Sequence, residues 1–206
     1  IINAGINGAD SYREILLIKE KLIEYGPELI ISYTGVNDSG GYAREIIFDE
    51  TKDNSTQNLF KFASYPWYRT PFVINNILSE NLINGNLING KKILELSPDD
   101  IQKNSELFKK NWTQSCAFLE NNQIISVLIL QPSLITKTIV SDFEKSIGLD
   151  VNYRKQQLEK FSNELELLNE HCNHTLDLRY IINNTSETTY YDNIHMNDLG
   201  NQIVAK

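Results

Sequence analysis

The segment that most constrains the fold of this chain is residues 29–38, LIISYTGVND. It opens with a short run of apolar and β-branched residues, which is typical of a strand buried on both faces of a parallel sheet. Gly35 then allows a sharp turn, and the polar side chains of Asn37 and Asp38 follow. Because parallel sheets place their chemistry just beyond the carboxyl ends of the strands, we expect this segment to supply both core and site.

The residues before this strand predict a β–α–β unit. Residues 1–8, IINAGING, read as the end of a strand followed by turn residues. A helix is expected next, capped by Asp10 or Ser11 and stopped by Gly26-Pro27. A strand, a helix and a second strand with short connections imply parallel strands and a right-handed crossover.

Further elements of the same alternating kind are expected downstream. They are a helix that starts at Ser97-Pro98, a strand over 124–130, a helix over about 151–170, a strand over 175–181 and a final helix capped by Asn197 or Asp198. The alternation predicts an α/β fold, a three-layer α/β/α sandwich around a parallel sheet.

The segment between residue 38 and the next predicted strand is too long for a simple crossover, and the helix that starts at Ser97-Pro98 accounts only for its last part. We interpret residues 39–96 as a cap-like insertion in a single domain over 1–206. Its aromatic residues are expected to form a small core for the cap or to line a pocket for a sugar or acyl group. They are Phe60, Phe62, Tyr65, Trp67, Tyr68 and Phe72. The chain starts at Ile1 rather than Met and ends within a helical pattern, so we expect truncation at both ends, with the first strand missing.

Composition excludes some classes of function. The formal net charge is -8 and the pI is about 4.9, which argues against nucleic acid as a partner. No apolar run reaches the roughly 18 residues of a membrane span. Cys116 and Cys172 could pair, although two cysteines do not establish a redox compartment. Neighbouring His171 and His174 have no second ligand pair, so no metal or cofactor is predicted.

Four residues stand at strand ends or on the loop before the last helix: Gly8, Asn37, Asp192 and His195. Acyl transfer needs donors aimed at a developing oxyanion, which a backbone N–H and an amide side chain can supply. It also needs a base, and a carboxylate that holds this base in one tautomer. Asp192 and His195 are close enough in the chain to converge, while Asp38 is expected to orient the Asn37 loop.

Several short motifs, taken in order, resemble those of the SGNH (GDSL-type) hydrolase family. Residues 3–8 (NAGING) resemble its second block, residues 35–38 (GVND) its third block, and residues 192–195 (DNIH) its fifth block. Residues 197–201 (NDLGN) are similar to the usual start of the last helix of that family. The motifs are weak singly, but their order and their places in the predicted fold make a more specific signal.

This resemblance implies a flavodoxin-like SGNH hydrolase fold with an insertion after the GxND strand. It also implies a role for each predicted site residue. The Gly8 N–H and the Asn37 amide would form the oxyanion hole. Asp192 and His195 would be the acid and base of a Ser-His-Asp triad.

The first block of the family, GDS, carries the nucleophilic serine and is absent from this sequence. No internal serine replaces it well: Ser11 is interpreted as a helix cap, Ser32 lies within the strand and Ser39 lies in the insertion. We therefore expect the nucleophile to lie outside this fragment, which would be inactive alone.

For the parent protein the resemblance implies an SGNH-type esterase that acts on O-acyl esters, for example a bacterial carbohydrate acetyl esterase. The expected partner is a small-molecule or glycan ester, in an extracytoplasmic or cell-envelope location, with no membrane span in this chain. Two alternatives remain open. One is an O-acyltransferase with the same site, and the other is a non-catalytic α/β binding module that has lost the nucleophile.

Overall fold

The structure is a computed structural model that describes residues 1–6, 8–41, 43–46, 96–147 and 152–206. The chain divides into two compact units, Ile1–Ile46 with Glu95–Lys206, and Ile47–Leu94. The described residues all belong to the first unit. The predicted aromatic core of the cap, from Phe60 to Phe72, lies outside them, so a single domain with a cap remains a prediction.

The described unit is built on a three-stranded parallel sheet with the strand order β1-β2-β3. The strands are β1 (Leu29–Thr34), β2 (Ile125–Leu130) and β3 (His174–Asp177). β1 pairs with β2 along its whole length, whereas β3 pairs only with Val127 to Leu130 of β2. The predicted α/β class with a parallel sheet is therefore confirmed.

The predicted strands at the two ends of the sheet differ from the structure. The strand expected over 175–181 ends at Asp177, because the Asp177 carboxylate accepts a hydrogen bond from the Arg179 N–H and turns the backbone. The strand end expected at Ile1 and Ile2 is also wrong. Both side chains are exposed, and no described strand pairs with them.

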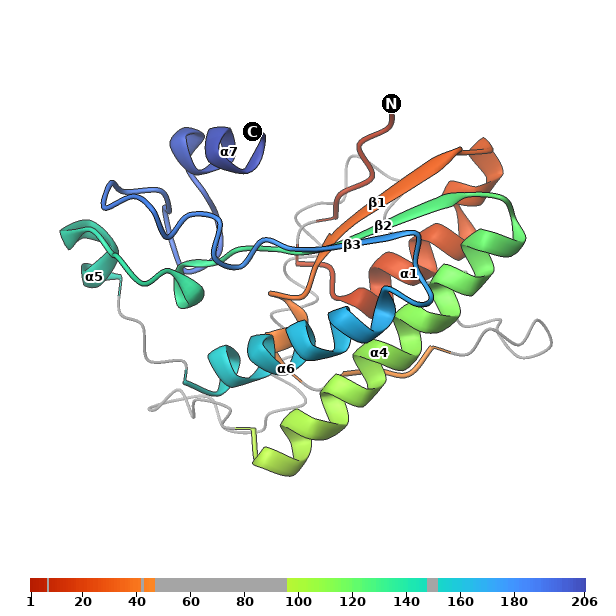
Figure 1. Ribbon diagram of the computed structural model, residues 1–206, viewed down its shortest axis with the longest axis horizontal. Coiled ribbons are helices and arrows are strands. Elements are labelled where there is room, and N and C mark those ends of the chain that lie inside the picture. The colour runs from red at the N-terminus through yellow and green to blue at the C-terminus, as the bar shows by residue number, and fades with distance from the viewer. Residues whose placement is uncertain (7, 42, 47–95, 148–151) are drawn as a thin grey trace, which may run out of the picture. The chain divides into compact units, whose positions relative to one another are not determined.

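The helices α1 (Ser11–Glu20), α4 (Pro98–Asn121) and α6 (Asn152–Leu168) lie on one side of the sheet (Figure 1). The other described helical elements are η1 (Leu22–Tyr25), η2 (Asp38–Gly40), η4 (Leu134–Thr136), α5 (Asp142–Ser146) and α7 (Asp198–Val204). The helices predicted from Ser97-Pro98 and over 151–170 are confirmed, with small shifts at their ends.

The core lies between these helices and the covered face of the sheet. Phe108 of α4 stacks on Phe161 of α6 with 4.3 Å between ring centroids, and Trp112 meets Phe108 edge-on. Apolar side chains at helical spacing predict this packing, and the predicted stripes on both helices are buried. They are Ile101, Phe108, Trp112 and Leu119 on α4, and Leu158, Phe161, Leu165 and Leu168 on α6.

The other face of the sheet is open in the described unit. Along β1 the burial alternates, so Ile30 is buried while Leu29 and Ile31 are 47% and 60% exposed. Ile125 of β2 and Leu176 of β3 lie on this open face and are similarly exposed. The prediction that residues 29–33 are buried on both faces is therefore wrong for the part of the chain that the structure describes.

The helix caps follow the sequence with one exception. Ser97 and Asp100 form a reciprocal capping box at α4, and Asn197 caps α7 by accepting from Gly200 N–H. At α1 the cap is Asp10, whereas Ser11 is the first helical residue and is buried. The interpretation of Ser11 as a cap is wrong, because its side chain bonds a distant carboxylate described below.

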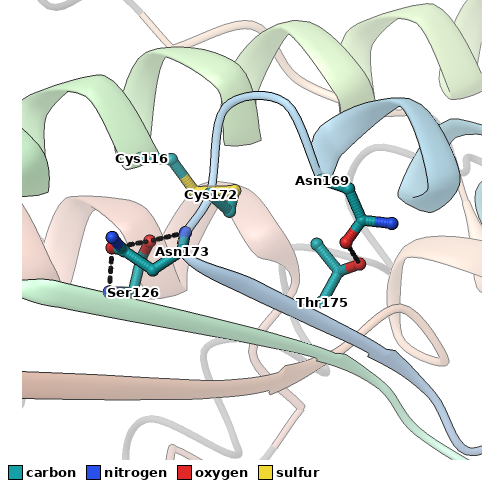
Figure 2. The surroundings of a disulfide bond; sticks show 6 residues. All are labelled: Cys116, Ser126, Asn169, Cys172, Asn173 and Thr175. Carbon is teal, nitrogen blue, oxygen red and sulfur yellow. Dashed lines mark hydrogen bonds between the residues drawn. A yellow bond between two sulfur atoms is a disulfide. The ribbon is translucent and has the colours of Figure 1, made fainter.

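A disulfide joins Cys116 of α4 to Cys172, which lies in the turn between α6 and β3 (Figure 2). The two Cα atoms are 5.0 Å apart, and the bond links positions separated by 56 residues. Next to it, Asn173 accepts hydrogen bonds from the Ser126 backbone N–H and hydroxyl, which connects the same turn to β2. A disulfide and hydrogen bonds thus hold the residues just before β3 against α4 and β2.

Candidate functional site

Asp192 and His195 converge, as their spacing predicts. The Asp192 Oδ2 lies 2.7 Å from the His195 Nδ1, and its Oδ1 accepts the backbone N–H groups of Ile194 and His195. The His195 side chain is 64% exposed. A carboxylate on Nδ1 leaves Nε2 as the free ring nitrogen, which is the arrangement of a general base and its orienting acid.

The hydrogen bonds also set the charge on Asp192. Partial burial favours the neutral acid, but the His195 N–H, the His195 ring and the Ile194 N–H together outweigh burial and hold the pKa of Asp192 below its ordinary value. Asp192 is therefore ionised at neutral pH, as an orienting carboxylate must be.

The loop that carries this pair is braced at both ends. Tyr190 and Met196 form an antiparallel bridge, and the Tyr191 N–H donates to the His195 carbonyl oxygen at 2.8 Å. In the middle of the loop, the Asn193 carbonyl oxygen accepts from the Leu134 N–H at 3.1 Å. The loop predicted before the last helix is thus a closed turn that is bonded to the residues that follow β2.

Gly8 and Asn37 lie on two loops that contact each other. The Asn37 Nδ2 donates to the Ala9 carbonyl oxygen at 2.8 Å, directly after Gly8 in the chain. Gly8 has φ of +70°, a left-handed conformation that glycine adopts without strain. The structure therefore brings the two predicted oxyanion residues into one region, with one amide proton of Asn37 already used within the protein.

Gly35 is required by both backbone and packing. Its φ is +103°, and a Cβ added there would lie 2.3 Å from the Leu130 Cδ1 of β2. The predicted sharp turn after β1 is therefore confirmed, and it sets the position from which Asn37 and Asp38 emerge.

Asp38 is the anchor of this region. It is 7% exposed, and each carboxylate oxygen lies 3.0 Å from the Ser11 backbone nitrogen, whose N–H it accepts. The Ser11 hydroxyl donates to the same carboxylate, and Thr34 lies within 3.5 Å. Asp38 thus connects the end of β1 to the first turn of α1, beside the loop of Gly8. This agrees with the prediction that Asp38 orients the Asn37 loop.

Burial dominates the electrostatics of Asp38. It raises the pKa of this carboxyl to about 6, although the Ser11 hydroxyl and N–H oppose the rise. Burial and the nearby Asp38 likewise raise the pKa of Glu14 well above its ordinary value. The sequence did not reveal this pair of buried carboxyls, because Glu14 and Asp38 are brought together only by the packing of α1 against the residues that follow β1.

The predicted site has two halves, Asp192 with His195 and Gly8 with Asn37, and the two are not directly bonded to each other. Within the described ranges, no hydrogen bond or ion pair joins Asp192 or His195 to Gly8 or Asn37. A surface pocket beside the disulfide, lined by Glu170 among others, and another near Lys160 contain none of the predicted site residues.

In the described part of the chain, no group of three His, Cys, Asp or Glu side chains is arranged so that it could hold a metal ion. Cys172 is in the disulfide, so it offers no thiolate beside His171 and His174. Among the described helices, none is both long and apolar enough to cross a membrane.

Comparison with known proteins adds no identification. No protein-family model matches the sequence, and no curated protein matches it either.

Proposed function

We propose that this chain belongs to an ester hydrolase of the SGNH type, in which His195 is the general base and Asp192 orients it. The observation that carries the proposal is the pairing of Asp192 Oδ2 with His195 Nδ1 at 2.7 Å, with Nε2 free. The resemblance of the GVND and NAGING motifs supports it, as does the contact between Asn37 and the Ala9 carbonyl oxygen. The finer fold assignment, a flavodoxin-like three-layer sandwich, belongs to the same proposal.

In this mechanism a serine hydroxyl attacks the acyl carbonyl, and His195 Nε2 takes its proton. The Gly8 N–H and the second Asn37 amide proton stabilise the oxyanion. His195 then gives the proton to the departing alcohol. Water, deprotonated in turn by His195, attacks the acyl carbonyl; the bond to the serine oxygen breaks as His195 returns the proton to that oxygen, which releases the carboxylic acid and restores the serine. Asp192 stays ionised throughout and holds the imidazole.

The proposal requires a serine at the end of a further strand, which the resemblance puts in a block before residue 1. The coding sequence upstream of Ile1 tests this directly. If the upstream strand has no serine at its carboxyl end, the hydrolase proposal fails and the non-catalytic binding module replaces it.

The activity itself is tested on the protein that includes that block. We expect a fluorophosphonate probe to label one serine and p-nitrophenyl acetate to be hydrolysed, with both lost in His195→Ala. His174→Ala is the matched control, since His174 lies in β3 rather than in the loop. Full labelling of His195→Ala would contradict the role of His195. Adding acceptor glycans separates hydrolysis from acyl transfer.

The disulfide supports a location outside the reducing cytoplasm, because such bonds persist in oxidising compartments. The test is thiol titration of the denatured protein isolated from its native compartment. Two free thiols would contradict this part of the proposal.

A further inference from the structure

Beyond the residues of the proposed triad, the structure contains a fully buried ion pair. The Lys137 Nζ lies 2.8 Å from one Glu144 carboxylate oxygen and 3.0 Å from the other. The two side chains are 1% and 0% exposed. A buried ion pair contributes little net stability, because desolvation offsets much of its attraction. Stability alone therefore does not account for this pair.

The contacts of this pair converge on residues 187–189. The Lys137 ammonium also donates to the Glu187 carbonyl oxygen at 2.7 Å and to the Thr189 hydroxyl at 3.1 Å. The Glu144 carboxylate accepts from the Thr189 N–H at 2.9 Å. Both charges are therefore used to fix the backbone and side chain of Thr189, which comes from a distant part of the chain.

Thr189 is directly joined to the loop of Asp192 and His195. Its carbonyl oxygen accepts from the Asn197 N–H at 2.9 Å, and the next residue, Tyr190, forms the bridge that closes the loop. The Gly200 backbone approaches so closely that an added Cβ would lie 2.6 Å from the Thr189 carbonyl oxygen. Any displacement of Thr189 therefore moves both ends of the loop.

We propose that Lys137 and Glu144 are positioning residues, which hold the Asp192–His195 pair in its bonded geometry by fixing Thr189. The catalytic consequence rests on the proposed function, but the positioning itself does not. The pair touches neither Asp192 nor His195, so it acts only through the backbone of the loop. The two positioning residues are buried, whereas the side chains of Asp192 and His195 are exposed.

The experiment reads the His195 ring directly, by long-range ¹H–¹⁵N correlation NMR of the 206-residue chain. The chain has three histidines, and the ring signals that disappear in His195→Gln are those of His195. In the wild type we expect the neutral ring to carry its proton on Nδ1, because Asp192 accepts there. Glu144→Gln keeps the shape but not the charge, and Thr189→Val removes only the hydroxyl. In both we expect loss of the Nδ1–H tautomer in favour of Nε2–H.

Gln157→Met is the matched control. Gln157 is fully buried and donates to the Ile101 carbonyl oxygen and the Ser105 hydroxyl, between α4 and α6 and away from the loop. It should weaken the fold without changing the tautomer, and Thr189→Ser should restore the wild-type tautomer lost in Thr189→Val. An unchanged tautomer in folded Glu144→Gln and Thr189→Val would overturn the proposal. So would an equal change in Gln157→Met.

A kinetic readout then connects positioning with catalysis. In an active protein, Thr189→Val should lower kcat at least tenfold with KM nearly unchanged, and Thr189→Ser should recover kcat. A change in KM alone would contradict the positioning role. If no ester hydrolysis is found at all, the proposed function fails, while the NMR result still decides whether Lys137 and Glu144 position the pair.

Discussion

Two buried carboxylates, Asp38 and Glu144, are bonded to segments next to the two halves of the candidate site, and their environments shift the pKa in opposite directions. Asp38, which follows β1, accepts hydrogen bonds from neutral donors of Ser11, and burial raises its pKa to about 6. For Glu144 burial acts in the same direction. However, hydrogen bonds from Lys137 and from the N–H groups of Thr189 and Ser141 outweigh it and lower the pKa to about 2.

The difference shows that burial alone does not decide the charge of a carboxyl group. A cation at hydrogen-bonding distance, with backbone N–H donors on the remaining lone pairs, keeps Glu144 ionised. Without a cation, Asp38 changes protonation close to neutral pH. The loop of Asp192 and His195 is therefore held by a permanent charge pair, and the loop of Asn37 by a carboxyl group whose charge depends on pH.

The largest expected effect comes from removing the cation. Lys137→Met should lower the free energy of unfolding by about 3–5 kcal/mol, because Glu144 then remains buried without a counter-ion. Urea denaturation at pH 7 measures it. The double variant Lys137→Met/Glu144→Leu should recover much of the loss, and no recovery would show that packing rather than charge is responsible.

Titration of Asp38 should give the next largest effect. Since folding raises its pKa, its contribution to stability is fully present below its ordinary pKa and is lost as the pH rises through about 6. The loss at pH 7 is on the order of 3 kcal/mol. The free energy of unfolding should therefore fall less between pH 4 and pH 7 in Asp38→Asn than in the wild type, by about the contribution of Asp38. Glu14 titrates in the same direction and remains in both proteins.

Glu144 gives the opposite pH profile and sharpens the contrast. Its contribution is present above its ordinary pKa and is lost only as the pH falls through about 2. Glu144→Gln should therefore leave the stability profile between pH 5 and 8 unchanged in slope. A slope change there as large as that of Asp38→Asn would remove the distinction between the two sites.

A smaller effect is expected at Gly200, which packs against Thr189. Alanine usually stabilises a helix relative to glycine, but here a Cβ would meet the Thr189 carbonyl oxygen at 2.6 Å. Gly200→Ala should therefore destabilise the protein by about 1–3 kcal/mol. Gly41→Ala is the control, since among the described residues nothing lies within 4 Å of its added Cβ. Thermal unfolding of both variants decides the sign.

The smallest expected effect is that of Ser11→Ala, which removes one neutral donor to Asp38 and should lower stability by about 1 kcal/mol. The pH at which Asp38 titrates should also move upward, since the lost hydroxyl stabilised its charged form. In an Asp38→Asn background the change in the pH profile should vanish. A shift that persists there would assign the effect to another group.

The sequence predicted the repeating features of the fold well. Apolar residues at helical spacing located α4 and α6, and a serine before a proline located the start of α4. These signals come from residues near one another in the chain, so they can be read without knowing which distant residues the helices contact. The extent of β3 was not predicted well, because residues 175–181 read as one strand although the Asp177 carboxylate accepts the Arg179 backbone N–H and turns the chain there.

For the site, the sequence predicted that Asp192 and His195 converge, since side chains three residues apart on a turn can come within hydrogen-bonding distance. It also determined that the backbone must turn at Gly35. Only the tertiary structure decided which carboxylates are buried and what charge they hold. Ser11 meets Asp38, and Lys137 and Glu144 meet Thr189, across long stretches of sequence. Such contacts depend on burial and on distant partners, which no local pattern encodes.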